Sequence, residues 1–316
     1  MSGVARPARE RPAWLAVDGI VLLDKPSGLG STPALQSVRR LLRAAKAGHA
    51  GTLDPLATGM LPLCFGQATK ACGQLLGSSK AYRARLLLGQ ATETGDAAGR
   101  VLAESPVPEL SEEAVAAVLA GLQGPQLQTP PMYSALKLQG RPLYELARQG
   151  HEVPREPRPI VIERLELAAL ERDVLDFEVV CSKGTYVWVL GEEIARRLGT
   201  LGHLAALRRL WVAPFEHQPM VGIDTIREWA EDPDRGTPPW LLPVDRAFTH
   251  LGRLDLDATA ALHLRQGRTL QAPKCAAAGA DGDLLRAYDP QGRFLGLVGQ
   301  RAGRLRVERL FVPGAG

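Results

Sequence analysis

The chain has 316 residues, of which 45% are hydrophobic and 23% charged, and 38 Lys and Arg residues against 34 Asp and Glu residues give a formal net charge of +4. This composition excludes a chain that is disordered throughout, and the length favours two domains. Arginine supplies 31 of the basic residues, which suits phosphate contacts but equally follows from a bias in genome composition, so the charge permits nucleic-acid binding without demonstrating it.

The first predicted elements lie before residue 62. An apolar run at 19–24 ends at Lys25-Pro26 and predicts a buried strand. Apolar residues at helical spacing predict a helix over 33–45. Residues 46–62 contain three Gly and two Pro without periodicity, so we expect a long loop there. Loops of that length inside compact domains are usually functional or disordered, and the small and apolar residues here favour function.

Strands and helices then follow without regular alternation, which predicts an α+β fold. Ser111 followed by acidic residues indicates the start of a helix over 111–120. Gly199 marks the end of a helix over 185–198. Residues 204–213 fit either a strand or a helix. The other elements expected before residue 232 are a helix at 66–77 and strands at 80–88, 99–104, 159–169 and 174–182. We expect a domain boundary at 232–243. Beyond it, the sequence predicts a helix near 257–265 and short strands with turns at Asp281-Gly282 and Asp289-Pro290.

Several kinds of site lack their motifs. Gly28-x-Gly30 has no third glycine, and no phosphate-binding loop or nucleophile elbow is present. No histidine pair has the spacing of a metal site, so we expect no metal. Because the nucleotide-binding motifs are also missing, we expect no cofactor. The four cysteines form no C-x-x-C, and no apolar run approaches the roughly 18 residues of a membrane span. We expect a cytoplasmic protein that does not enter the membrane, with residues 1–15 as a flexible tail.

The expected loop at 46–62 carries His49 and Asp54 among small residues. Asp54-Pro55 fits a turn initiator, with His49 as a solvated loop residue. A glycine-flanked carboxylate with few cations nearby also suits nucleophilic or general-base chemistry. The residues alone leave both interpretations open.

Seven blocks along the chain carry a resemblance. They are GHAGTLDPLATG at 48–59, GQATK at 66–70, KAYR at 80–83, PPMYSALK at 130–137, LYELARQG at 143–150, CSKGTY at 181–186 and LRRL at 207–210. With Lys25-Pro26, they occur in the order found in the bacterial tRNA pseudouridine-55 synthases of the TruB type, which the chain closely resembles over about residues 19–313.

This resemblance implies an isomerase that flips uridine 55 out of the tRNA T-loop, breaks its N-glycosidic bond and rejoins the base through carbon. It implies an α+β fold, with a mixed or antiparallel-sheet catalytic domain over 16–240 and a small β-rich, PUA-like RNA-binding domain over 244–316. Such an isomerisation needs no cofactor. The implied partner is tRNA, held by its T-arm and also by its acceptor arm, and the protein is expected to be a monomer.

The resemblance also assigns roles to individual residues. Asp54 is the implied catalytic carboxylate, and Tyr82 is expected to stack on the flipped base and to offer its hydroxyl for proton transfer. The other implied substrate-binding residues are His49, Tyr186 and Leu207, and the implied supporting residues are Lys25, Lys70, Lys183 and Arg208.

Trp188 departs from the family pattern, in which segment 183–187 is followed by an arginine that pairs with the catalytic aspartate. If Thr185 caps the following helix, position 188 lies in its first turn, where the helix dipole disfavours a cation. The family's arginine is therefore functional, and its loss should raise the pKa of Asp54.

Three explanations of Trp188 stay open. Another basic residue, such as Arg83 or Lys183, substitutes for the arginine; the enzyme is weak or inactive; or the tryptophan is a sporadic change. The alternative function is a tRNA-binding folding helper, and a guide-RNA-dependent synthase subunit is disfavoured because long basic extensions are missing. Both tRNA functions predict salt-sensitive binding, so only product formation separates them.

Overall fold

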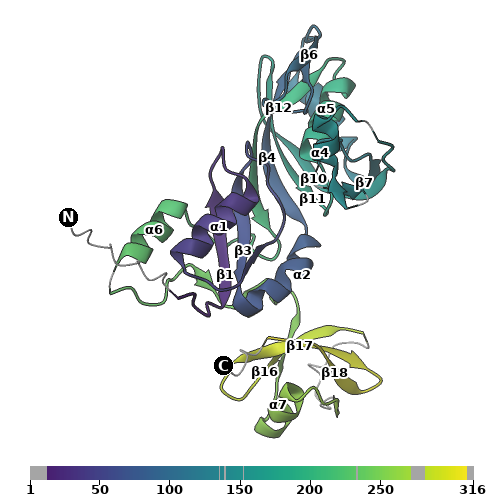
Figure 1. Ribbon diagram of the computed structural model, residues 1–316. Helices are drawn as coiled ribbons and strands as arrows, with labels where there is room; N and C mark the ends of the chain where they lie inside the picture. Colours follow the sequence, from purple (N-terminus) through teal and green to yellow (C-terminus); the bar gives the residue numbers. More distant parts are fainter. Residues whose placement is uncertain are drawn as a thin grey trace, which may run out of the picture.

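The computed structural model describes residues 13–134, 136–138, 140–151, 153–232, 234–271 and 282–311. A large mixed sheet carries most of the chain, and a smaller β-rich domain follows at the C-terminal end (Figure 1). This confirms the expected α+β fold with a small β-rich C-terminal domain. No helix in the described ranges is long and apolar enough to cross a membrane.

The large sheet has nine strands, and the pairing of β3 with β12 is parallel whereas its other pairings are antiparallel. In spatial order the strands are β13 (Leu241–Leu242), β1 (Gly19–Lys25), β3 (Thr58–Phe65), β12 (Gly202–Val212), β4 (Lys80–Leu88), β11 (Val174–Cys181), β10 (Arg158–Glu171) and β7 (Gly124–Gln128), with β2 (Ala47–His49) paired to β3.

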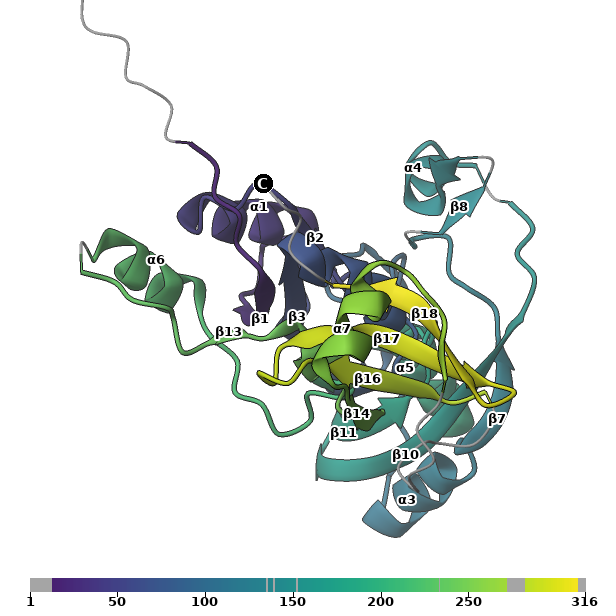
Figure 2. The ribbon, with the colours of Figure 1, turned by 90° about the horizontal axis from the view of Figure 1, so that it is seen from below.

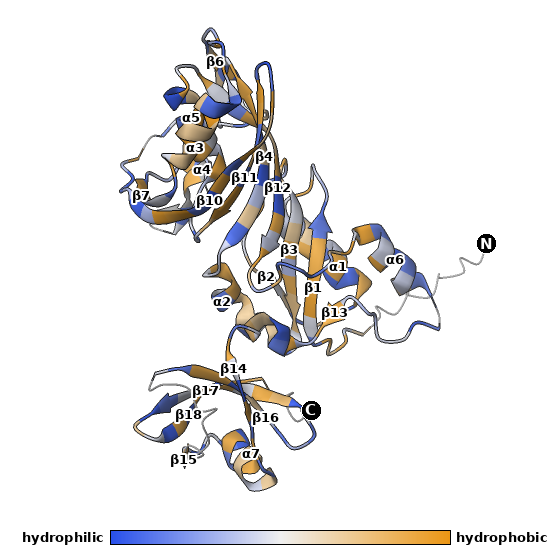
Figure 3. Cartoon of the chain, turned by 180° about the vertical axis from the view of Figure 1, so that it is seen from behind, coloured by the Kyte–Doolittle hydropathy of each residue, from blue (hydrophilic) through white to orange (hydrophobic). Residues whose placement is uncertain are grey.

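Helices α1 (Ser31–Leu41), α3 (Glu112–Ala120), α5 (Val187–Arg197) and α6 (Ile223–Glu231) contribute to the main hydrophobic core on one face of this sheet. Viewed from below, α6 and α3 lie at opposite ends of the molecule (Figure 2). Strand β4 shows why the sheet has two different faces: Tyr82, Ala84 and Leu86 are buried, whereas Arg83 and Arg85 between them are exposed. Hydrophobic and hydrophilic residues alternate in the same way along other strands (Figure 3).

On the other face, η1 (Gly66–Ala71) and α2 (Cys72–Leu76) cover the sheet near the C-terminal domain. That domain contains η2 (Val244–Phe248), α7 (Ala258–Arg265) and a sheet in the order β14 (Gly252–Asp255), β16 (Leu284–Tyr288), β17 (Phe294–Arg301), β18 (Arg304–Leu310) and β15 (Leu270–Gln271). Ile20, Leu75, Phe248 and Phe311 belong to one buried cluster. The small domain is therefore docked on the large sheet through a shared apolar core.

Small elements complete the fold. They are the hairpin of β5 (Gln90–Thr92) and β6 (Val101–Glu104), the hairpin of β8 (Lys137–Leu138) and β9 (Arg141–Pro142), and α4 (Leu143–Arg148).

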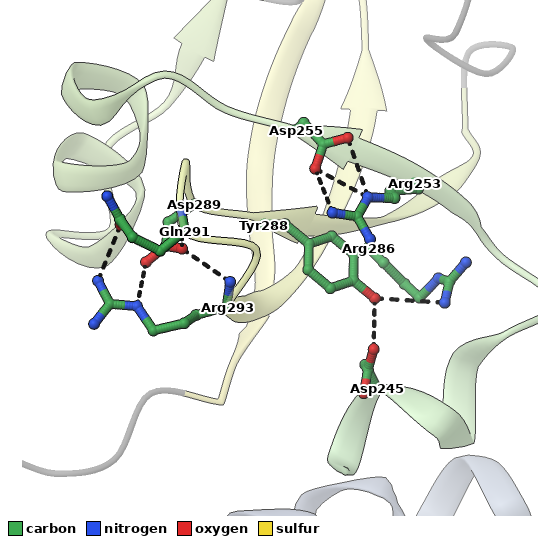
Figure 4. Close-up of polar contacts among 8 residues, drawn as sticks. All are labelled: Asp245, Arg253, Asp255, Arg286, Tyr288, Asp289, Gln291 and Arg293. Carbon is green, nitrogen blue, oxygen red and sulfur yellow. Dashed lines mark hydrogen bonds and ion pairs between the residues drawn. The ribbon is translucent and has the colours of Figure 1, made fainter.

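Polar contacts fix the turns of the C-terminal domain (Figure 4). The Tyr288 hydroxyl donates to Asp245 at 2.8 Å and so connects β16 to η2. The buried carboxylate of Asp289 accepts hydrogen bonds from the backbone N–H groups of Gln291 and Arg293 and from the Arg293 and Arg265 guanidinium groups. Asp289 thus satisfies the donors of the turn between β16 and β17.

We expect Asp289→Ala to lower the free energy of unfolding by about 2–4 kcal/mol, because the substitution leaves these donors unpaired. Chemical denaturation followed by circular dichroism measures the change. Asp255→Ala is the matched control: its ion pair with Arg253 is exposed, so its loss should change stability by less than about 1 kcal/mol. Equal effects of the two substitutions would contradict a special role of Asp289.

Several predicted elements are confirmed. Strand β4 has the expected bounds, and Ser111 caps α3 by accepting a hydrogen bond from the Ala114 N–H at 3.2 Å. Gly199 ends α5 with φ of +82°. The ambiguous residues 204–213 belong largely to strand β12. Of the expected tail 1–15, residues 1–12 lie outside the described residues, whereas the Leu15 N–H donates to the Arg43 carbonyl.

Other predictions are wrong. The expected loop 46–62 contains β2 and the start of β3, so the connection between these strands is only 50–57. The expected helix 66–77 is split into η1 and α2, and the helix expected over 33–45 is α1, which begins and ends earlier. Thr185 does not cap α5: the N-cap is Tyr186, while the Thr185 hydroxyl donates to the Ser182 carbonyl at 3.0 Å. Strand β7 and helix α6 were not predicted.

Candidate active site

A cavity of about 290 Å³ lies on the main-core face of the sheet, where the 50–57 connection meets strands β4 and β12 and the start of α5. It is lined by Gly51, Thr52, Asp54, Leu76, Lys80, Tyr82, Tyr133, Ser134, Ser182, Gly184, Thr185, Tyr186, Trp188 and Arg209. The wall of this cavity thus brings together three residues that are far apart in the sequence: Asp54, Tyr82 and Tyr186.

The 50–57 connection is held at its middle and by the strand that follows it. The Ser31 hydroxyl donates to the Leu53 carbonyl at 2.9 Å and accepts from the Leu53 N–H at 2.7 Å, which fixes the residue before Asp54. Gly59 has φ of +94°, and a Cβ there would lie 2.1 Å from the Arg209 carbonyl oxygen. Only glycine allows β3 to approach β12 so closely. The close approach places the connection beside Arg209.

The carboxyl group of Asp54 has a perturbed environment. Burial and, to a smaller extent, the negative charge of Asp96 raise its pKa to about 6, although the positive charge of Lys25 opposes this shift. A carboxylate with a pKa near neutrality is suited to accept and return a proton. Asp96 was not among the predicted site residues, because nothing in the sequence connects it to Asp54, 42 positions earlier.

Lys25 is fully buried beneath the connection. Its ammonium group donates to the carbonyls of Pro26 at 2.8 Å and Leu29 at 2.5 Å and is 3.5 Å from the carbonyl of Pro55. Burial lowers its pKa to about 8, against the attraction of Asp54. Lys25 therefore supports the chain around Asp54 and supplies positive charge behind it.

Two further cations line the cavity. Arg209 is buried, and its guanidinium donates to the Met60 carbonyl at 2.6 Å and to the Gly51 carbonyl at 3.2 Å. Burial and the charge of Arg209 lower the pKa of Lys80 to about 8. Neither cation was predicted as a site residue. In the strand register Arg209 lies opposite Tyr82, which is the signal that could have identified it.

The tyrosines differ in how they are held. Burial raises the pKa of Tyr82, so its hydroxyl stays protonated at neutral pH. The backbone of Tyr186 is clamped by Gln128, whose side chain accepts from its N–H at 2.8 Å and donates to its carbonyl at 3.1 Å. Both rings belong to the cavity wall, where flat faces can contact a planar base.

Trp188 occupies the wall in the first turn of α5. Its ring centroid lies 5.7 Å from that of Tyr186. Its indole Nε1–H is buried and has no hydrogen-bond partner in the part of the chain that the structure describes. The two expected substitutes for the family arginine do not line this cavity: Arg83 pairs with Glu178 on the exposed face of the sheet, and Lys183 is exposed.

The remaining predicted residues lie outside the cavity wall. His49 is half-buried in β2, and burial followed by the charge of Arg209 lowers its pKa. Leu207 belongs to the main core and lines a separate cavity of about 420 Å³. Arg208 pairs with Asp24 at 2.8 Å beside that second cavity. Lys70 donates to the Leu310 carbonyl at 2.8 Å and so contacts the C-terminal domain.

Comparisons with known proteins agree with this architecture. Residues 39–187 match the N-terminal domain of the TruB family of pseudouridylate synthases, and residues 252–311 match a C-terminal domain of pseudouridine synthase II TruB. The chain is 50% identical to the tRNA pseudouridine synthase B of Aromatoleum aromaticum over 89% of this chain and 88% of that protein. It is 44% identical to the protein of that name from a Marinomonas species, over 94% and 96%.

A solved structure with a similar fold is a complex of Cbf5, Nop10 and Gar1. The match has a TM-score of 0.71 and 25% identity and covers 93% of this chain and 85% of that one.

Proposed function

Because the chain belongs to the TruB family of pseudouridine synthases, we propose that it converts uridine 55 in the T-loop of tRNA to pseudouridine. The observation that carries this proposal is the environment of Asp54. A carboxyl group with its pKa raised to about 6 lines a cavity beside three tyrosines and two cations. This arrangement suits a flipped, planar base attached to an anionic backbone.

In the proposed reaction, the bond between uracil N1 and ribose C1′ breaks, the base turns, and a bond forms between C5 and C1′. The C5 proton leaves and N1 gains a proton, so atoms and charge balance. Attack on the sugar and abstraction of a proton both need the ionised form of Asp54. Tyr82 stacks on the base, and its protonated hydroxyl is available to transfer a proton.

The proposal extends to how tRNA is held. The catalytic domain over 16–240 would hold the T-arm, and the domain over 244–316 would contact the acceptor arm. Strand β18 supports this role because its exposed Arg304 and Arg306 can contact phosphates. Tyr186 would contact the flipped nucleotide, and His49 would act from behind the cavity wall. Leu207 would contribute from the core beside the second cavity, and Lys25, Lys70, Lys183 and Arg208 would have supporting roles. A monomer in the cytoplasm is part of the same proposal.

The test is to incubate the purified protein with an unmodified tRNA transcript and to map pseudouridine along it. We expect the product at position 55 alone. A transcript with cytidine at that position is the matched control and should give none. Modification elsewhere, or tRNA binding without any product, would contradict the proposal and favour the folding-helper alternative.

The pH dependence follows from the pKa of Asp54. Since the ionised form is required, kcat/KM should fall about tenfold for each pH unit below about 6 and level off above it. Asp96→Asn removes a like charge, lowers the pKa of Asp54 and should move this acidic limb to lower pH. Asp176→Asn, on the exposed face of the sheet, should leave the limb in place. A profile that is flat through pH 6 would show that Asp54 is not the titrating group.

A further inference from the structure

Cys64 and Cys72 lie next to each other on the face of the large sheet that is opposite the main core. Cys64 is fully buried near the end of β3, and Cys72 is the half-buried first residue of α2. Both side chains belong to the apolar cluster shared with the C-terminal domain. The mechanism proposed above uses neither thiol.

The strand register brings the two sulfur atoms within reach of each other. Gly48 in β2 is the antiparallel partner of Cys64 in β3, and the Cβ atoms of such partners lie about 4.5–5.5 Å apart. A Cβ built on Gly48 would lie 3.4 Å from the Sγ atom of Cys72. Because position 48 has no side chain, the Cys72 sulfur lies against Gly48, and the Cys64 and Cys72 side chains share a hydrogen bond.

The two thiols have different reactivity. The hydrogen bond from the Cys64 thiol lowers the pKa of Cys72, and Lys46 lowers it further against the effect of burial. The same hydrogen bond and burial raise the pKa of Cys64. Cys181 lies elsewhere, and burial raises its pKa to about 11. Cys72 is therefore the better nucleophile of the pair.

We propose that Cys64 and Cys72 are a redox-modification site. A low-molecular-weight disulfide such as oxidised glutathione oxidises the two thiols, which then form a reversible intramolecular disulfide with each other. The Cys72 thiolate attacks one sulfur of oxidised glutathione, which releases one glutathione thiolate and leaves a mixed disulfide. Cys64 then loses its proton and attacks the Cys72 sulfur, which releases the second glutathione. Two electrons pass from the protein thiols to oxidised glutathione, and excess reduced glutathione reverses both steps.

The disulfide would join β3 to the start of α2, close to the active-site cavity. Helix α2 ends at Leu76, which lines that cavity, and His49 follows Gly48 in β2. The bond would therefore restrain the segment between η1 and the cavity wall without touching Asp54.

The sequence provides a direct test by peptide mapping. The full-length protein is equilibrated with oxidised glutathione, quenched with acid, alkylated in denaturant and digested with trypsin. Cleavage after Lys46, Lys70 and Lys80 places Cys64 in peptide 47–70 and Cys72 in peptide 71–80. We expect these peptides to be linked, two hydrogen masses below their sum, and to separate after dithiothreitol treatment. Peptide 173–183, which contains Cys181, should be alkylated throughout.

Two variants test the order of attack. Cys72→Ser should abolish the linked pair and leave Cys64 alkylated. Cys64→Ala should abolish it and leave Cys72 as a stable mixed disulfide with glutathione. The proposal would be overturned if the wild-type protein gave no linked peptides after treatment with oxidised glutathione. It would also be overturned if peptide 71–80 carried glutathione and never formed the link to peptide 47–70. Because Cys72 is only half-buried, its Ser variant remains informative if Cys64→Ala fails to fold.

Discussion

Asp54→Asn is expected to lower kcat/KM for pseudouridine formation by at least about 1000-fold, equivalent to about 4 kcal/mol in the barrier, while tRNA binding changes little. The substitution keeps the size of the side chain but removes the one carboxylate among the described residues that line the cavity. Ser31 holds the neighbouring Leu53 through backbone contacts, so the connection should keep its conformation. Rates from a tritium-release or mapping assay, together with a binding isotherm, measure both effects.

The same substitution should stabilise the protein. Burial raises the pKa of Asp54 from 3.8 to about 6, so the folded state loses stability as the pH rises through this interval. At pH 7.5 Asp54→Asn removes that cost and should raise the free energy of unfolding by about 1–3 kcal/mol, with no gain below pH 4. Asp176→Asn, on the opposite face, should show neither the loss of activity nor this gain. Activity that survives Asp54→Asn would overturn the assignment of the catalytic carboxylate.

The sequence predicted most elements whose two faces differ. Strand β4 and helix α3 each have one buried and one exposed side, so their apolar residues repeat at the expected period. Strand β3 is buried on both faces and shows no alternation, and Gly59 and Pro62 within it suggest a loop. The glycine serves packing instead, because any side chain there would collide with the backbone of β12. Sequence patterns cannot distinguish these two uses of glycine.

Only part of the candidate site could be predicted from the sequence, because strand register and tertiary packing place the other residues. The motif blocks identified Asp54, Tyr82 and Tyr186, which line one cavity. The choice between Arg208 and Arg209 depends on strand register, since neighbouring residues point to opposite faces of a sheet. Asp96 reaches the site through a loop whose position is set by tertiary packing, so no spacing in the sequence reveals it.

Trp188 occupies a position at which a cation could interact with nearby carboxylates. Residue 188 lies beside the loop of Asp96, since a Cβ on Gly95 would lie 3.6 Å from the Cβ of Trp188. It also lines the cavity that contains Asp54, and its buried N–H has no partner among the described residues. The negative charge of Asp96 contributes to the raised pKa of Asp54, and the uncharged indole of Trp188 does nothing to offset it.

We expect Trp188→Arg to increase kcat/KM for pseudouridine formation by more than tenfold and to move the acidic limb of the pH profile to lower pH. A guanidinium at this place can pair with both carboxylates, which orients Asp54 and stabilises its ionised form. The unfavourable helix dipole costs only about 0.3–1 kcal/mol in this turn. Trp188→Met is the matched control, because it removes the indole without adding charge. An unchanged rate for Trp188→Arg, or an equal gain for Trp188→Met, would show that the missing charge does not limit this enzyme.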